Sequence, residues 1–216
     1  MTSHHPSPLP QKGEGVRLAR SFYRRDPVIV ARALLGQRLV RVLDGQRLAG
    51  IIVEAEAYLG IPDRAAHTHG GRRTPRVASM WRDGGHAYVY FTYGMHHCMN
   101  VVAGAEGDPV AVLLRAIEPT EGLEIMRRHR LAAQRDLDLC RGPARLCAAL
   151  QIDRKLDGLD MTTSNTLYIE QLRQRPLPAS QITTTARIGV AYAGEWAKRE
   201  LRFLVRGNPH ASGMQR

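Results

Sequence analysis

The hydrophobic pattern near the start of the chain predicts a helix followed by a β-hairpin. Asp26 and Pro27 precede the apolar run VIVARALLG, so an N-cap, a first-turn proline and a terminal glycine stand in the order that a helix requires. We therefore expect a helix from about Pro27 to Leu35. The segments QRLVRVL and QRLAGIIVEAEAY flank the dipeptide Asp44-Gly45, which is typical of a tight turn between two strands.

Alternating patterns further along the chain predict an antiparallel meander. HAYVYFTY (86–93) alternates in period two, and MHHCMNVVAG and PVAVLLRAI supply two more strands joined by a turn at about 104–108. Two helical and two strand patterns follow, at 121–133, 143–150, 186–194 and 201–207. Neither a repeat nor a linker divides the chain, so we expect one mixed α/β (α+β) domain over 18–216 after a disordered tail at 1–17.

The segment between the hairpin and the meander, residues 59–85, is too long for a simple connection. It contains two prolines and five glycines, with one helical turn indicated around DRAAH. Loops of this length in compact domains are usually functional or disordered.

The second hairpin strand carries two carboxylates on one face. Alternation places Glu54, Glu56 and Tyr58 on one side of the strand and small or apolar residues on the other. A polar strand face is most often solvated, and we expect this of Glu54. Glu56 differs because Arg115 stands alone in an apolar run and requires a partner or a site. Together they could activate a water molecule or form a structural ion pair, and the residue types leave both open.

Composition and charge favour a polyanionic partner. The formal net charge is +11 over 216 residues, and 28 of the 31 basic residues are arginine. Such a chain favours nucleic acid first and an anionic membrane second. Three cysteines without a CxxC pair indicate reduced thiols, and no apolar run is long enough to span a bilayer. We expect a soluble protein that stays inside the cell.

Aromatic residues near the carboxylates have two interpretations. Tyr58, His67, Tyr90 and Tyr93 are core aromatics or a stack for a planar ligand, and a nucleobase is the planar ligand that a basic protein most often meets. The histidines lack the spacing and carboxylate partners of a metal site. We therefore expect neither a metal nor a cofactor.

Several blocks of the sequence together resemble one known family. EAEAYLG, DRAAHTHGGRRTPR, YVYFTYGMHHCMNVV, VLLRAIEP, LCRGPARLC and ARIGVAYAGEWAKRELRFLVRGNP are similar to the alkyladenine (3-methyladenine) DNA glycosylases, in the family's order. The resemblance implies a single domain around a curved, mainly antiparallel sheet with flanking helices and without a helix-hairpin-helix motif. It also implies base-excision repair of alkylated or deaminated purines in double-stranded DNA.

The resemblance implies a role for each matching residue. Glu56 falls at the general base that deprotonates the attacking water, Arg115 orients that water, and the Ile188 carbonyl is a further water ligand. The pocket for the extruded base comprises Tyr58, His67, Tyr90 and Asn100, where Asn100 rejects normal guanine. Tyr93 matches the wedge that fills the gap in the duplex, and Met95 flanks it.

The position of the lysines predicts a monofunctional enzyme that leaves an abasic site. Lyase chemistry needs a positioned amine, and Lys12, Lys155 and Lys198 all lie outside 50–100. A non-catalytic binder of distorted DNA is the alternative. We expect a monomer without a membrane partner, in the cytoplasm at the nucleoid if the source is bacterial, which we favour, or in the nucleus if it is eukaryotic.

Overall fold

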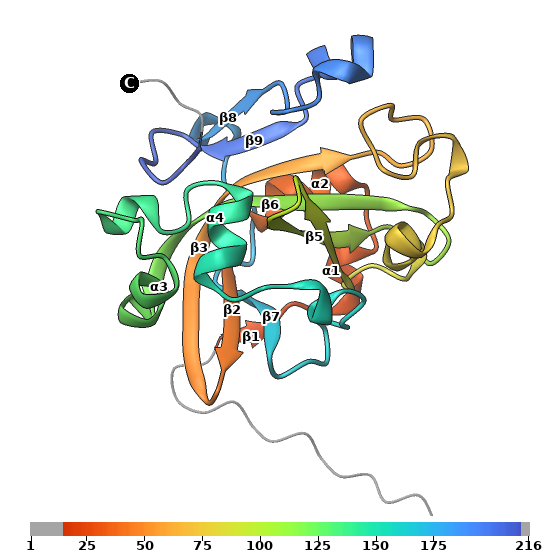
Figure 1. Ribbon diagram of the computed structural model, residues 1–216. Helices are drawn as coiled ribbons and strands as arrows, with labels where there is room; N and C mark the ends of the chain where they lie inside the picture. Colours follow the sequence, from red (N-terminus) through yellow and green to blue (C-terminus); the bar gives the residue numbers. More distant parts are fainter. Residues whose placement is uncertain (1–14, 213–216) are drawn as a thin grey trace, which may run out of the picture.

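One antiparallel sheet organises residues 15–212, which are the residues that the computed structural model describes. The strand order is β1-β7-β2-β3-β6-β5-β4, and β9 pairs with both β3 and β8. The sheet curls around the long strands β3 and β6 (Figure 1). The strands are β1 (Val16–Arg17), β2 (Arg38–Leu43), β3 (Gln46–Tyr58), β4 (Ala87–Thr92), β5 (His96–Ala103), β6 (Val110–Glu121), β7 (Leu167–Gln171), β8 (Ile182–Thr185) and β9 (Arg202–Val205).

Most of the expected tail falls outside the described residues. This applies to residues 1–14, whereas the last two residues of the range 1–17, Val16–Arg17, pair with β7. The hairpin predicted around Asp44-Gly45 is confirmed as β2 and β3, and the predicted meander is confirmed as β4, β5 and β6.

The helices are short. They are α1 (Arg20–Tyr23), α2 (Pro27–Leu34), α3 (Leu123–His129) and α4 (Pro143–Ala149). Of these, α2, α3 and α4 lie where the sequence predicts helices, whereas α1 was not predicted. The Asp26 carboxylate caps α2 by accepting from the Val28 and Ile29 amides at 2.8 and 3.3 Å. Helix α3 is shorter than its predicted range because β6 extends to Glu121 and Gly122 starts the helix in a left-handed conformation.

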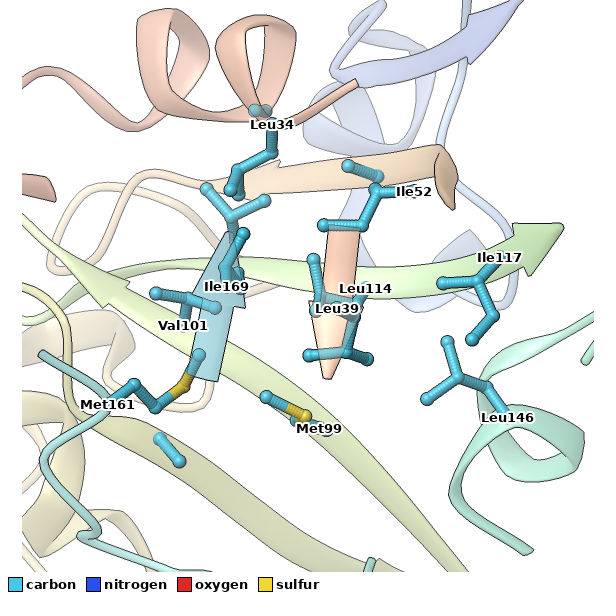
Figure 2. Packing of buried hydrophobic residues seen from close by; sticks show 14 of the residues in the cluster. Leu34, Leu39, Ile52, Met99, Val101, Leu114, Ile117, Leu146, Met161 and Ile169 are labelled. Carbon is cyan, nitrogen blue, oxygen red and sulfur yellow. The ribbon is translucent and has the colours of Figure 1, made fainter. Parts of the chain in front are cut away.

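One face of the curled sheet carries the main apolar core. Figure 2 shows Leu34 of α2 packed towards Ile52, Leu39 and Ile169, with Leu146 of α4 facing Ile117. These residues are fully buried, and two helices far apart in the sequence, α2 and α4, thus cover the same surface. The opposite face is left for polar and aromatic side chains.

Paired irregularities in β3 and β6 decide which side chains reach that opposite face. The register skips Val53 on β3 and Arg115 on β6. The side chains that face the core consequently change from even-numbered to odd-numbered positions, between Ile52 and Ala55 on β3 and between Leu114 and Ile117 on β6. The polar face therefore receives Glu54, Glu56 and Tyr58 opposite Arg115.

The strand predicted at 186–194 is wrong. This segment is irregular and leads into a 3₁₀ helix at Ala191–Lys198, with Gly189 and Gly194 at φ of +79° and +61°. The backbone of this segment does not pair with a strand at Ile188, because the Ile188 amide donates its hydrogen bond to the Glu56 carboxylate. The strands β7 and β8, which the apolar pattern does not predict, contain the more polar segments LYIEQ and ITTT.

The long segment 59–85 is ordered, but the turn at DRAAH is not helical. The Asp63 carboxylate accepts from the Ala65 amide at 2.9 Å and from the Leu59 amide at 3.0 Å, which holds a compact turn. The 3₁₀ helices of this segment lie later, at His69–Gly71 and Pro75–Trp81; the others are Asp136–Asp138, Arg154–Leu156 and Ala179–Gln181.

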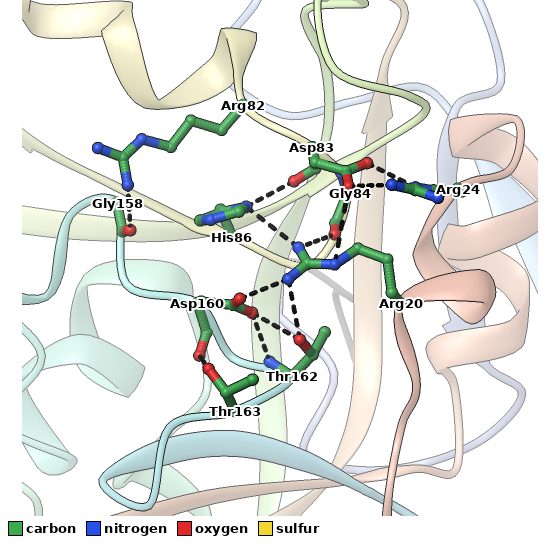
Figure 3. Close-up of polar contacts among 10 residues, drawn as sticks. All are labelled: Arg20, Arg24, Arg82, Asp83, Gly84, His86, Gly158, Asp160, Thr162 and Thr163. Atoms are coloured by element: carbon green, nitrogen blue, oxygen red, sulfur yellow. Dashed lines mark hydrogen bonds and ion pairs between the residues drawn. The ribbon is translucent and has the colours of Figure 1, made fainter. Parts of the chain in front are cut away.

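An arginine network fixes the start of β4. Arg20 of α1 forms an ion pair with Asp160 and donates to the Gly84 carbonyl at 2.7 Å, and Arg24 pairs with Asp83 at 2.5 Å (Figure 3). His86 pairs with Asp160 as an isolated β-bridge. These contacts hold together three segments far apart in the sequence, next to the strand that carries Tyr88 and Tyr90.

Candidate active site

A cavity of about 390 Å³ opens on the polar face of the sheet. Strands β3 to β6 form its floor, and the segments after β3 and after β8 form its walls. The lining residues include Tyr58, His67, Tyr88, Tyr90, Tyr93, Asn100, Arg115, Ile188 and Tyr192. The lining brings together seven of the nine residues that the resemblance implies.

Glu56 lies beneath this cavity and is fully buried. Its Oε1 atom accepts from the Ile188 amide at 2.9 Å and lies 3.2 Å from Nη1 of Arg115. Its Oε2 atom accepts from the Tyr58 hydroxyl at 2.9 Å. Three donors from three segments thus converge on one carboxylate.

The expectation that Glu54 faces solvent is wrong. Its side chain is fully buried, and its Oε1 atom accepts from Nε of Arg115 at 2.9 Å and from Nε of Arg202 at 2.7 Å. Burial lowers the pKa of Arg115, but Glu56 and Glu54 outweigh this effect and the pKa is raised. The two carboxylates therefore share one permanently charged arginine.

The aromatic side chains build a wall from two strands, β3 and β4, and the segment after β3. The His67 ring lies edge-on to Tyr90 with centroids 4.6 Å apart, and its Nδ1 atom lies 2.8 Å from the Tyr88 hydroxyl. Burial, with Arg76 and Arg72 nearby, lowers the pKa of His67 to about 4, so its ring is neutral at neutral pH. Burial and the Glu56 carboxylate raise the pKa of Tyr58.

Asn100 is held at the cavity floor by a backbone contact. Its side-chain amide donates to the Tyr88 carbonyl at 3.1 Å, and the residue is almost fully buried. A single orientation is therefore favoured for the amide that faces the cavity.

The rim of the cavity is unusually apolar for an exposed surface. Tyr93 is 84% exposed and Tyr192 is 68% exposed, and both residues line the cavity. Met95 does not line it, but lies two residues from Tyr93 at the tip of the β4–β5 hairpin and is 70% exposed. Tyr93 has a left-handed backbone (φ +52°), which is uncommon for a bulky residue.

Exposed arginines lie on the long segment beside the cavity. Four of them form no salt bridge with an acidic side chain of the described residues, namely Arg64, Arg72, Arg73 and Arg76. Arg73 stacks on Trp81 at 3.8 Å, and Arg76 donates to the Phe91 carbonyl at 3.3 Å. Their charge is thus available to an anionic ligand.

A buried ion pair clamps the two walls of the cavity together. Arg187 donates to both carboxylate oxygens of Asp63, at 2.5 and 2.9 Å, and both side chains are inaccessible to solvent. Arg187 also donates to the Ala57 carbonyl and lies 4.7 Å from the centre of the Tyr58 ring. This pair and the rim residue Tyr192 were not predicted, because their partners lie more than 120 residues away.

Residues 15–212 contain no cluster of histidine, cysteine and carboxylate side chains that could hold a metal ion. Among the same residues, no helix is both long and apolar enough to cross a membrane.

Comparisons with known proteins identify the family of the chain. The family model described as methylpurine-DNA glycosylase matches residues 21–209. The chain belongs to the methylpurine-DNA glycosylase family. A human protein named DNA-3-methyladenine glycosylase is 45% identical over 216 residues, which cover 95% of this chain and 71% of that protein. A protein of Desulfitobacterium hafniense is 46% identical over 203 residues, which cover 91% of this chain and 98% of that protein.

Membership in the methylpurine-DNA glycosylase family makes the chain a hydrolase of N-glycosyl bonds that acts in the repair of alkylated DNA. The resemblance inferred from the sequence blocks is therefore confirmed. The α+β fold with its curled antiparallel sheet is also confirmed.

Proposed function

We propose that this glycosylase is monofunctional: it extrudes a damaged purine from duplex DNA into the cavity and hydrolyses the N-glycosidic bond with a water activated by Glu56. The product is a free base and an abasic site. The observation that carries this proposal is the environment of Glu56, a buried carboxylate at the floor of an aromatic cavity with an arginine beside it.

The hydrogen bonds of Glu56 leave room for a water molecule. A carboxylate offers about four lone-pair directions. The Ile188 amide and Arg115 occupy the two on Oε1, and the Tyr58 hydroxyl occupies one on Oε2. The remaining direction on Oε2 is the one that accepts a proton from the attacking water, while Arg115 and the Ile188 carbonyl orient that water.

The cavity suits a flipped purine. Tyr58, His67 and Tyr90 offer flat apolar faces, and the neutral His67 ring does not repel an alkylated base that carries positive charge. Asn100 faces the edge of the base, where its fixed amide excludes the 2-amino group of guanine. An alkylated purine is already a good leaving group, so water activation and support of the cationic sugar are what the enzyme supplies.

The exposed rim suits the gap that a flipped nucleotide leaves behind. We assign Tyr93 as the intercalating wedge and Met95 as its neighbour in the minor groove. The unpaired arginines on 59–85 then contact the flanking phosphates. Neither Lys155 nor Lys198 lines the cavity, and Lys12 lies outside the described residues, which supports hydrolysis without a Schiff base.

The experiment that tests this function is release of hypoxanthine or 3-methyladenine from duplex DNA in the presence of EDTA. We expect free base and an abasic strand that alkali cleaves. An enzyme without chemistry would bind damaged duplex in a salt-sensitive manner and yield no abasic product even at stoichiometric amounts. Activity lost in EDTA and restored by zinc would contradict the metal-free mechanism.

Replacing Tyr93 with Asn should separate stability from activity. Asn tolerates a left-handed backbone better than Tyr, so the free energy of unfolding should stay equal or rise slightly. Excision from duplex DNA should fall by about 10–100-fold, because unstacking a base costs a few kcal/mol without a wedge. Excision from single-stranded DNA, measured alongside a urea unfolding curve, should change little. Equal losses on both substrates would exclude the wedge role.

A further inference from the structure

Glu54, the second carboxylate of β3, has hydrogen-bond partners on both of its oxygens and does not line the cavity. Glu54 accepts from Nε of Arg115 (2.9 Å), Nε of Arg202 (2.7 Å) and the Ser212 hydroxyl (3.0 Å) through Oε1, and from the Ser212 amide (2.5 Å) through Oε2. All three partner residues are buried. The carboxylate is therefore fixed in position.

This fixed carboxylate determines where Arg115 points. A guanidinium is planar, so a hydrogen bond at Nε fixes the direction of its two terminal nitrogens. With Nε directed at Glu54, Nη1 of Arg115 lies 3.2 Å from Oε1 of Glu56. The irregularity of β6 at Arg115 and that of β3 at Val53 bring the two carboxylates and the guanidinium to one face.

Glu54 also limits how strongly Arg115 can hold Glu56. Arg115 pairs with Glu54 and with Glu56, so without the Glu54 charge Glu56 would be its one remaining carboxylate partner among the described residues. Arg115 would then rotate towards Glu56 and occupy the lone pair that the water requires. A carboxylate that competes for the arginine keeps the base available.

The segment 208–212 completes this arrangement. The Ser212 carbonyl accepts from Arg202, and the neighbouring Ala211 carbonyl accepts from Arg141 at 2.8 Å. Asn208 donates to Glu118 of β6 at 2.8 Å. These contacts attach the segment 208–212 to β9 through Arg202, to β6 through Glu118, and to Arg141.

We propose that Glu54 and Ser212 are positioning residues, which hold Arg115 at the distance from Glu56 that lets it orient the water without saturating the base. This inference rests on the proposed function of Glu56 and Arg115. Neither residue lines the cavity, so both act through Arg115.

Glu170 provides a matched control. It is another fully buried glutamate of the same sheet, held by Arg47 at 2.8 Å and Arg38 at 3.4 Å, on β7 and away from the cavity. Glu170→Gln should weaken the fold in the same way as Glu54→Gln. It removes a buried charge from an arginine pair without touching Arg115.

The test compares single-turnover base release, binding of damaged duplex and thermal unfolding in full-length variants, at a temperature where all are folded. Glu54→Gln should slow release by about 10–100-fold with duplex affinity changed less than about threefold. Ser212→Ala should slow it less, and Ser212→Thr, which keeps the hydroxyl, should restore it. Glu170→Gln should release base at nearly the wild-type rate.

A double-mutant cycle identifies the route of the effect. In an Arg115→Lys background, adding Glu54→Gln should slow release by less than about twofold, because the residue through which Glu54 acts is already altered. The positioning role would be overturned if the losses of rate from Arg115→Lys and Glu54→Gln were fully additive. Equal rates of base release in Glu54→Gln and Glu170→Gln would overturn it as well. Absence of base release by the wild type would instead overturn the proposed function.

Discussion

Glu56→Gln is expected to slow release of hypoxanthine or 3-methyladenine from duplex DNA by about 10²–10⁴-fold, the range of general-base catalysis. The amide has no charge with which to take a proton from water. Three donors already point at this position, from Ile188, Arg115 and Tyr58, so the amide nitrogen also opposes a donor and cannot replace the carboxylate. The measurement is single-turnover release by the purified variant, with abasic strands quantified after alkali.

Binding is the control for this variant. Affinity for the damaged duplex should stay within a few fold of wild type, because the rim and the exposed arginines are untouched. An exposed carboxylate provides a second comparison, since Glu195→Gln alters only a surface pair with Lys198 and should leave the rate unchanged. Full activity of Glu56→Gln would rule out this residue as the base.

Arg187→Ala is expected to lower the free energy of unfolding by about 3–5 kcal/mol. The substitution leaves the Asp63 carboxylate buried without its bidentate partner. It also removes the hydrogen bond to the Ala57 carbonyl and the contact with the Tyr58 ring. For a domain of this size the melting temperature should fall by roughly 6–20 °C.

Urea unfolding of the variant at neutral pH measures this loss. Lys198→Ala breaks a fully exposed pair and should change stability by less than about 0.5 kcal/mol. Asp63→Asn combined with Arg187→Ala should lose less than the two single losses added together, since no charge is then left unpaired. A loss below about 1 kcal/mol in Arg187→Ala would show that the clamp does not hold the walls.

Local patterns predicted the central hairpin, the three-stranded meander and the helix at Pro27–Leu34, because each is specified by its own turn residues and periodicity. They also placed Glu54, Glu56 and Tyr58 on one face. What they could not predict is that this face is covered. The covering comes from 59–85 and 186–198, whose positions depend on contacts such as Asp63–Arg187, 124 residues apart.

The two interpretations of Glu56 and Arg115 show the same limit. Residue types left a catalytic pair and a structural ion pair open, and the structure divides the contacts of Arg115 between two carboxylates. Nε of Arg115 is bonded to Glu54, while Nη1 lies beside Glu56. Neither the skipped register at Val53 and Arg115 nor the contact with Ser212 leaves a local signature in the sequence.

The contact between Glu54 and Ser212 joins residues 158 positions apart and has a consequence during protein synthesis. Of the four described hydrogen bonds to Glu54, three come from residues beyond 200. A nascent chain in which β3 and β6 have been made, but the residues beyond 200 are still inside the ribosome, lacks these donors. Under the proposed positioning role, such a chain would have no catalytic activity until Arg202 and Ser212 dock beside β3.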